Sequence, residues 1–254
     1  MTDTDQLRES YLNGRILLVD KPYRWTSFDA VNKIKSILRY RLKIKKIRIG
    51  HAGTLDPLAT GLLIICTGRS TKLMERFREL DKSYTGTFVL GQTSPSYDLE
   101  TTPSEKRPVD HLPADRLTAC AEKLSGPQMQ MPPQYSAKKV GGERAYNQAR
   151  QGMTSELKPT PVHITKFQLT SISLPTVDFH VQCSKGTYIR ALARDYGECL
   201  GTGAFLSSLR RTEIRPFHVD NALAMEEIQE YLLTQLDGKA DIHPGDETAS
   251  GTMS

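Results

Sequence analysis

The stretch IGHAGTLDPLATGLL, from Ile49 to Leu63, places one carboxylate, Asp56, among residues that restrict the backbone. Its three glycines permit angles that other residues resist, and Pro57 fixes its own φ, so we expect a tight, rigid loop. The residues directly beside Asp56 are uncharged. Such an aspartate either opens a turn, as Asp-Pro pairs commonly do, or lies in a poorly solvated pocket and performs chemistry. The rest of the chain decides between the two.

Outward from this loop, apolar and periodic segments alternate along the chain. Alternation and short apolar runs predict strands at 15–19, 84–90, 161–174 and 177–183, whereas 62–66 is an apolar run of unassigned structure. Apolar residues at helical spacing predict helices after Thr26 or Ser27 and at 113–124, 142–150 and 189–200. Strict strand–helix–strand alternation is rare. We therefore expect an α+β protein with a mixed, largely antiparallel sheet flanked by helices.

The same pattern predicts one domain over residues 14–236, because no break near the middle is clean enough for two. The polar residues 1–13 are expected to be a disordered lead-in, and the acidic residues 237–254 a disordered tail. Residues 127–152 combine methionines, prolines and a basic helix. They are typical of an exposed arm inserted into the domain.

The charge of the chain is unevenly distributed. Its net charge is +5, of which residues 225–254 carry −6 and residues 1–224 carry +11. From Lys33 to Arg48 there are eight basic residues and no acid. This run is either a solvated face or a rim that follows phosphates, and the basic body suits nucleic acid better than a neutral metabolite.

Cysteine spacing and hydropathy exclude other classes of protein. The four cysteines form no C-x-x-C pair and have no histidine at ligand spacing, so the sequence predicts neither a zinc site nor a disulfide framework. We expect small buried side chains in a reducing compartment. No apolar run reaches about 18 residues and residues 1–9 do not resemble a signal peptide, which favours a soluble cytoplasmic protein without a membrane anchor.

Three segments together resemble the motifs of the bacterial tRNA pseudouridine-55 synthase family: Lys21-Pro22 with Trp25-Thr26-Ser27, the 50–61 loop, and 183–190 with Leu209-Arg210-Arg211. Asp81-Lys82-Ser83-Tyr84 and residues 133–138 strengthen the match. The resemblance runs from about Gly14 to Phe217 in family order. One Asp-Pro pair is weak, but five ordered motifs are specific.

The resemblance implies the pseudouridine synthase fold and isomerisation of uridine 55 in the T-loop of tRNA. The uracil is cut from C1′ at N1, turned, and rejoined through C5, after leaving the stacked interior of the loop. No redox or phosphoryl transfer occurs, so neither cofactor nor metal is implied. The arm at 127–152 would bind RNA, and the partner is the tRNA T-arm.

Asp56 matches the catalytic aspartate of the family. It acts as nucleophile or stabiliser, and attack at C6, attack at C1′ and elimination to a glycal all stay open. Arg190 matches the arginine that keeps this carboxylate ionised in a desolvated pocket. Tyr84 matches the tyrosine that stacks on the target base and helps remove the C5 proton.

Further matched residues concern substrate binding and support. Tyr188 and Leu209 match residues that line the uracil pocket, where a flat ring and an apolar wall suit a nucleobase. His51 matches the histidine that fills the space left by extruded bases. Lys21 and Pro22 would support the floor of the site.

Two positions depart from the family pattern. Arg24 stands where a glycine is usual, and Ser94-Pro95-Ser96-Tyr97-Asp98 replaces a Thr-Asp-Thr-x-Asp run. Beyond Val219 too few residues remain for the C-terminal RNA-binding (PUA) domain that many members carry. The sequence therefore indicates a short form that holds the T-arm alone.

We expect a monomeric, guide-RNA-independent enzyme. A tRNA-folding chaperone that opens the T-loop without modifying it is the second hypothesis, and intact Asp56 and Arg190 argue against it. An aspartate-dependent hydrolase is the third, but no water-activating histidine or second carboxylate stands near Asp56 in the sequence.

Overall fold

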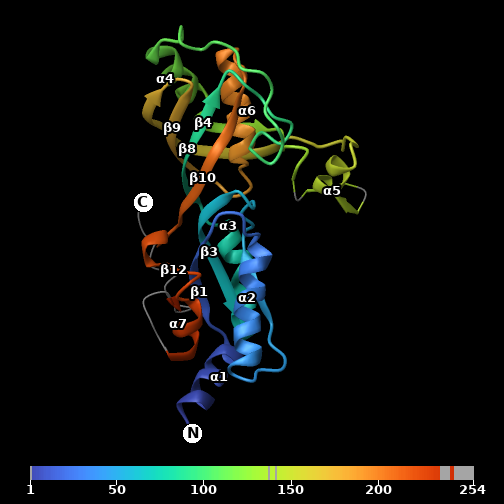
Figure 1. Ribbon diagram of the computed structural model, residues 1–254, viewed down its shortest axis with the longest axis vertical. Coiled ribbons are helices and arrows are strands. Elements are labelled where there is room, and N and C mark those ends of the chain that lie inside the picture. Colours follow the sequence, from blue (N-terminus) through green and yellow to red (C-terminus); the bar gives the residue numbers. More distant parts are fainter. Residues whose placement is uncertain (1, 137, 141, 235–240, 243–254) are drawn as a thin grey trace. The chain divides into compact units, whose positions relative to one another are not determined.

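The structure, a computed structural model, describes residues 2–136, 138–140, 142–234 and 241–242. By their internal contacts these residues form two compact units. Unit 1 comprises 1–82 and 210–254, and unit 2 comprises 83–209. The chain passes between them at the start of strand β4 and within strand β10 (Figure 1). Each unit is described by itself.

Unit 1 contains a sheet with the order β12-β1-β3-β10, to which β13, β2 and β11 are paired. Its central pair is antiparallel, with Ile16 opposite Cys66 and Lys21 opposite Gly61, whereas β12 runs parallel to β1. The strands are β1 (Ile16–Lys21), β2 (Ile49–Ala52), β3 (Ala59–Thr67), the end of β10 (Ala204–Ile214), β11 (Phe217–His218), β12 (Leu223–Ala224) and β13 (Asp241–Ile242).

Helices cover this sheet because both of its faces are apolar. Leu17 and Val19 of β1 pack with Leu63 of β3 against helices, while Ile16 and Leu18 enter a second cluster on the opposite face. This explains why β1 and β3 are continuous apolar runs instead of alternating ones. The helices are α1 (Asp3–Asn13), α2 (Ser27–Tyr40), η1 (Gly68–Leu73), α3 (Met74–Glu79), η2 (Val219–Asn221) and α7 (Ile228–Thr234).

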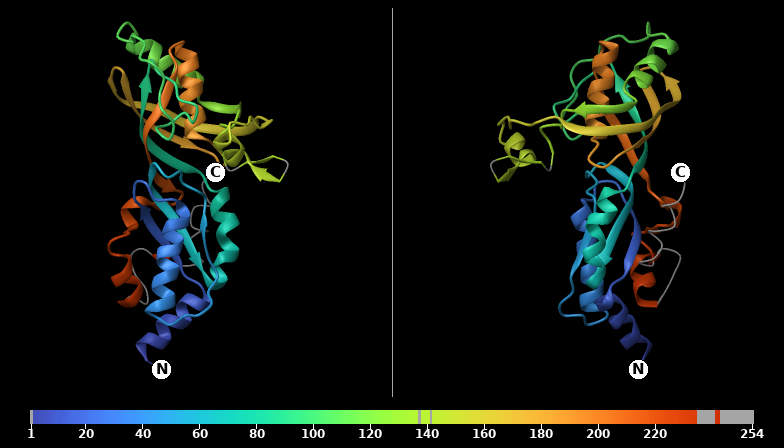
Figure 2. Two further views of the ribbon diagram at one scale, coloured as in Figure 1. Left: turned by 45° about the vertical axis from the view of Figure 1, so that its right-hand side comes forward. Right: turned by 180° about the vertical axis from the view of Figure 1, so that it is seen from behind.

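Unit 2 has the strand order β10-β4-β9-β8-β5, with a separate hairpin of β6 and β7. Helices α4 and α6 pack together, and Figures 1 and 2 show α5 standing apart from the sheet at the end of an extended segment. Phe88, Phe167, Phe179 and Tyr196 form an aromatic core between sheet and helix. The elements are β4 (Lys82–Leu90), α4 (Ala114–Lys123), β5 (Gly126–Gln130), β6 (Lys139–Val140), β7 (Glu143–Arg144), α5 (Ala145–Arg150), β8 (Thr160–Ser173), β9 (Thr176–Cys183) and α6 (Ile189–Leu200).

The α+β class and the largely antiparallel pairing are confirmed, but the predicted disordered lead-in is wrong. Asp3–Asn13 forms helix α1, which begins with a capping box between Thr2 and Asp5. Leu7 and Tyr11, four residues apart, are buried, and the Tyr11 hydroxyl donates to the carbonyl of Leu232 at 3.1 Å. Two large side chains on one helix face are enough to dock a segment whose average composition is polar. Of the predicted tail, Asp241 and Ile242 pair with β1, and the rest lies outside the described residues.

The expectation of four reduced cysteines is also wrong. Cys120 of α4 and Cys199 of α6 form a disulfide across 79 residues of chain, while Cys66 and Cys183 are buried and free. The spacing of the cysteines in the sequence did not predict this bond, because it is the packing of α4 against α6 that brings the two thiols together. No helix in the described part of the chain is long and apolar enough to cross a membrane.

Candidate active site

The loop that carries Asp56 joins β2 to β3 and is fixed at both ends. The Ala59 amide donates to the Asp56 carbonyl at 3.1 Å, which closes a tight turn. Before it, the Ser27 hydroxyl accepts from the Leu55 amide at 2.9 Å and lies 3.2 Å from the Leu55 carbonyl. Asp56 is half-buried. The loop therefore forms a tight turn that is tied to Ser27, and the tight turn is what the glycine and proline pattern predicted.

Lys21 is completely buried beneath this loop. Its ammonium donates to the carbonyls of Pro22 at 3.0 Å, Trp25 at 2.6 Å and Pro57 at 3.4 Å. Burial lowers the pKa of Lys21 to about 8, and the negative charge of Asp56 opposes that shift. One cation thus ties the Lys21-Pro22 motif to the residue that follows Asp56.

Arg24, where the family usually has glycine, adopts φ 66°, the left-handed conformation that glycine favours. Its amide donates to the Pro57 carbonyl at 2.8 Å. The turn before Trp25 is therefore formed with Arg24, at a cost in backbone strain of about 1 kcal/mol. This departure leaves the frame of the Asp56 loop intact.

Arg211 is a residue of this frame to which sequence reasoning gave no role, although it was quoted in the Leu209-Arg210-Arg211 motif. Its side chain is 2% exposed, and its guanidinium donates to the carbonyls of Leu62 at 2.7 Å and Gly53 at 3.1 Å. Gly61, with φ +103°, allows β3 to lie against the backbone of Arg211. Arg211 therefore braces the start of the Asp56 loop. This role of Arg211 becomes visible only in the structure, where β3 and β10 lie side by side.

His51 lies in β2 and is half-buried. Within the described part of the chain its Nδ1 has no hydrogen-bond partner. Burial, and then the charges of Arg211 and Arg78, lower the pKa of His51. The imidazole is therefore neutral near pH 7, a state that suits stacking against bases better than charge–charge recognition.

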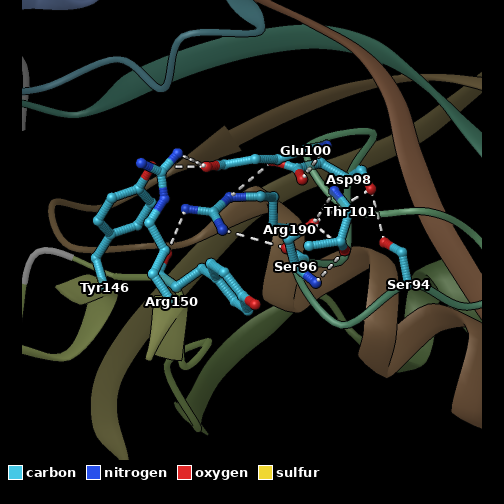
Figure 3. Close-up of polar contacts among 9 residues, drawn as sticks. Ser94, Ser96, Asp98, Glu100, Thr101, Tyr146, Arg150 and Arg190 are labelled. Atoms are coloured by element: carbon cyan, nitrogen blue, oxygen red, sulfur yellow. Dashed lines mark hydrogen bonds and ion pairs between the residues drawn. The ribbon is translucent and has the colours of Figure 1, made fainter. Parts of the chain in front are cut away.

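In unit 2, Arg190 lies in the first turn of α6 and is 5% exposed. Its Nε is 3.6 Å from Oδ2 of Asp98, and its Nη1 and Nη2 donate to the carbonyls of Ser96 at 3.2 Å and Tyr135 at 2.8 Å (Figure 3). Asp98 is also buried. A guanidinium held by a carboxylate and two carbonyls keeps a single orientation.

The segment Ser94–Asp98, which differs from the family pattern, supplies two of the groups that hold the Arg190 guanidinium, the Ser96 carbonyl and the Asp98 carboxylate. The Ser94 hydroxyl donates to the Asp98 carbonyl at 2.6 Å, and the Glu100 amide donates to Oδ1 of Asp98 at 2.9 Å (Figure 3). Ser96 is fully buried and its hydroxyl lies 2.7 Å from that of Thr101. Asp98, which matches the last aspartate of the Thr-Asp-Thr-x-Asp run, is therefore present and paired with Arg190. Sequence reasoning quoted Asp98 but gave it no role.

Tyr188 precedes α6 as its N-cap residue and is half-buried. The side-chain amide of Gln130, at the end of β5, accepts from the Tyr188 amide at 2.9 Å and donates to its carbonyl at 3.2 Å. Tyr84 is buried in β4, and Leu209 is half-buried in β10. Gln130 was not identified from the sequence, because a glutamine that anchors a backbone has no local signature.

The arm around α5 is attached to the Asp98 loop by one carboxylate. The Tyr146 hydroxyl donates to Oε1 of Glu100 at 2.6 Å, and the same oxygen receives Nη2 of Arg150 at 3.0 Å (Figure 3). The Arg150 guanidinium also lies 4.6 Å from the centre of the Tyr146 ring. The helix predicted over 142–150 is shorter in the structure. It is α5, Ala145–Arg150, and it begins after the β6–β7 hairpin.

The predicted site residues are divided between the two units. Lys21, Pro22, His51 and Asp56 belong to unit 1, whereas Tyr84, Tyr188, Arg190 and Leu209 belong to unit 2. Among the described residues there is no group of three or more His, Cys, Asp or Glu that could hold a metal ion. Unit 1 therefore contributes the carboxylate of Asp56 on a tight loop, and unit 2 contributes the guanidinium of Arg190 in a fixed orientation.

Comparison with known proteins gives consistent results. Residues 39–189 match the model of the TruB family pseudouridylate synthase N-terminal domain, and residues 190–244 match that of the tRNA pseudouridylate synthase B C-terminal domain. The chain is 47% identical over 225 residues to "tRNA pseudouridine synthase B" of Flavobacterium johnsoniae, covering 88% of this chain and 98% of that protein. It is 46% identical over 222 residues to the protein of the same name from Parabacteroides distasonis, covering 87% and 94%.

Among solved structures, a Cbf5-Nop10-Gar1 complex aligns with a TM-score of 0.66 and 24% identity, over 88% of this chain and 56% of that one. An H/ACA RNP bound to a substrate RNA containing 2′-deoxyuridine aligns with a TM-score of 0.66 and 22% identity, over 92% and 60%. These likenesses establish the fold. With the matched domains and the close curated relatives, they show that this chain belongs to the TruB family of pseudouridine synthases, which are RNA-modifying isomerases.

Proposed function

We propose that this protein converts uridine to pseudouridine in tRNA, and that its target is uridine 55 of the T-loop. The tRNA substrate follows from the relatives, which are named tRNA pseudouridine synthase B. The observation that carries the proposal is the framing of Asp56 by Lys21, Ser27 and Arg211. A loop fixed in this way positions one carboxylate for reaction, which a purely binding protein does not need.

Asp56 is the catalytic residue in this proposal. The reaction breaks the N1–C1′ bond of uridine and forms a C5–C1′ bond, and the proton lost from C5 is balanced by one gained at N1. Attack at C1′, attack at C6 and elimination to a glycal all begin with an ionised carboxylate. The product is an isomer of the substrate, so no co-reactant is consumed.

Arg190 supplies the second charge of the proposed site. Because Asp98 and the carbonyls of Ser96 and Tyr135 already fix its guanidinium, little reorganisation would be needed to stabilise Asp56 as an anion. Arginine stays protonated when desolvated, which lysine does not. We assign Arg190 the role of holding Asp56 ionised and oriented.

The remaining predicted residues bind the target nucleotide. Tyr84 would stack on the uracil and assist removal of the C5 proton, and Tyr188 and Leu209 would line the pocket. His51, neutral and half-buried, would occupy the space of the extruded bases. The support that Lys21 and Pro22 give to the floor agrees with the contacts of the Lys21 ammonium to the Pro22 and Pro57 carbonyls.

We further propose that the enzyme acts as a monomer in the cytoplasm on the T-arm, without guide RNA or protein partners. An unmodified tRNA transcript incubated with the purified protein should acquire one pseudouridine in its T-loop, mapped nucleotide by nucleotide. Asp56→Asn should bind the same transcript and lower the rate by more than about 10³-fold. Product from Asp56→Asn at the wild-type rate would remove the catalytic assignment. Binding without any product from the wild type would favour a chaperone.

A further inference from the structure

Two separate chain segments, within residues 35–48 and 68–72, form a basic surface on unit 1. A surface hollow of about 410 Å³ is lined by seven residues within 35–48, and a second one of about 360 Å³ is lined by Leu12 and by residues within 46–48 and 68–72. Lys46, Ile47 and Arg48 line both. The two segments are joined where the Gly68 amide donates to the Arg48 carbonyl at 2.8 Å. The cationic lining residues are Lys35, Arg39, Lys45, Lys46, Arg48, Arg69 and Lys72.

All seven cations are exposed, and no acid lines either hollow. Within the described part of the chain, none of the seven has an ion-pair partner. Seven positive charges around two adjoining hollows create a positive potential, which attracts polyanions. The surface therefore has the charge of a polyanion site.

The backbone beneath these cations is fixed by apolar anchors. Leu42 and Ile44 are buried in the core beside α2, whereas Lys43 and Lys45 between and after them are exposed. Ile47 packs partly against the same core. Burying two such side chains contributes about 3 kcal/mol or more, which is enough to hold the segment against the sheet. The cations are consequently presented from an ordered surface.

This basic surface lies at the opposite end of β3 from Asp56. Ile49, next to Arg48, pairs with Thr67 at the end of β3, while Asp56 precedes Ala59 at its start. Nine residues of strand separate the two ends by about 27 Å. A single nucleotide bound at Asp56 could not reach it. Only a ligand that continues far beyond the reacting uridine could occupy both places.

We infer that the basic surface of residues 35–48 and 69–72 binds the phosphodiester backbone of the tRNA beyond the T-arm, so that the protein holds more of the tRNA than the T-arm that the sequence alone indicated. The inference rests on the proposed function, because it takes the RNA bound at Asp56 to be the one that extends to the surface. Phosphate contacts of this kind position an RNA and add affinity without reading its sequence. They act on binding and leave the chemical step unchanged.

The test compares two RNAs with one triple variant, Lys46→Gln/Arg48→Gln/Arg69→Gln, which changes exposed side chains only. Full-length unmodified tRNA should bind the variant at least about 10-fold more weakly than the wild type, and the slope of log affinity against log salt should fall by about 2. An isolated T-arm hairpin should bind both proteins within about twofold, and the rate at saturating RNA should match the wild type.

A matched control removes three exposed cations of unit 2, Lys106→Gln/Lys123→Gln/Lys166→Gln. Equal weakening by the control, equal weakening on the hairpin, or unchanged binding of full-length tRNA would each overturn the inference. Binding of inorganic phosphate with no preference between the two RNAs would also overturn it. Pseudouridine is measured in the same samples, so a wild type that binds but forms none from either RNA counts against the proposed function alone.

Discussion

Asp98 and Arg190 form a buried ion pair in which Oδ2 of Asp98 lies 3.6 Å from Nε of Arg190, with side chains 7% and 5% exposed. The pair comes from the loop after β4 and the first turn of α6, which are about ninety residues apart in the chain. A buried arginine needs such a partner, because an unpaired charge in this position would cost several kcal/mol. The relationship makes Asp98 a positioning residue for Arg190.

Asp98→Asn should slow pseudouridine formation by about 10²-fold with little change in RNA affinity, because a guanidinium displaced by about 1 Å no longer meets its target. Asparagine keeps the oxygen that accepts from the Glu100 amide, so the loop should remain folded. Single-turnover rates at saturating tRNA measure the effect. Asp110→Asn, an exposed aspartate of the same unit, serves as the control. A weakened affinity with an unchanged rate would contradict the positioning role.

Lys21 should give the protein a specific dependence of stability on pH. Its pKa is lowered from 10.5 to about 8, so between these values the unfolded chain binds more protons than the folded one. The free energy of unfolding should therefore rise from pH 8 to 10.5, by at most about 3 kcal/mol, compared with Lys21→Met. Denaturant titrations of both proteins across this range test it. Parallel curves would show that Lys21 titrates normally.

His51 should be uncharged at pH 7 and resist protonation on acidification. Because its pKa is lowered, its contribution to stability is present above pH 6.5 and is lost as the pH falls towards the folded pKa. His51→Phe should remove that loss and retain stacking, whereas His51→Ala should weaken tRNA binding. Imidazole chemical shifts recorded against pH test the first part, and binding assays the second. A folded pKa at or above 6.5 would exclude the assignment.

Glu100 should control the opening of the arm around α5. Its carboxylate accepts from both Tyr146 and Arg150, and hydrogen bonds to a charged acceptor contribute about 1.5–3 kcal/mol. Glu100→Ala should therefore speed amide hydrogen exchange in residues 145–150 by about 10-fold or more, without changing exchange in α6. Glu105→Ala, an exposed glutamate of the same connection, is the matched control. Unchanged exchange in α5 would show that other contacts hold the arm.

The Cys120–Cys199 disulfide should stabilise unit 2. A bond closing a loop of this length contributes about 2–4 kcal/mol, chiefly by restricting the unfolded chain. Reduction, or Cys120→Ala, should lower the free energy of unfolding by that amount. The variant and the reduced wild type should then be equally stable, and a reductant should have no further effect on the variant. Thiol counting under denaturing conditions checks that the bond is formed.

The sequence by itself determined the class of fold, the elements around the candidate site and the family. Periodicity predicted α2, β4, α4 and α6 within a few residues, because each buries one continuous apolar face. The Gly- and Pro-rich pattern predicted the tight turn at Asp56, since those constraints act on the backbone locally.

The tertiary structure decided everything that depends on residues distant in the chain. The Arg211 brace, the Asp98–Arg190 pair and the Cys120–Cys199 bond arise where strands or helices pack. Helix α1 was missed because two apolar residues are too weak a pattern until a core receives them. Local propensity is written into neighbouring residues, whereas the partner of a buried charge or thiol is fixed only when the whole chain has packed.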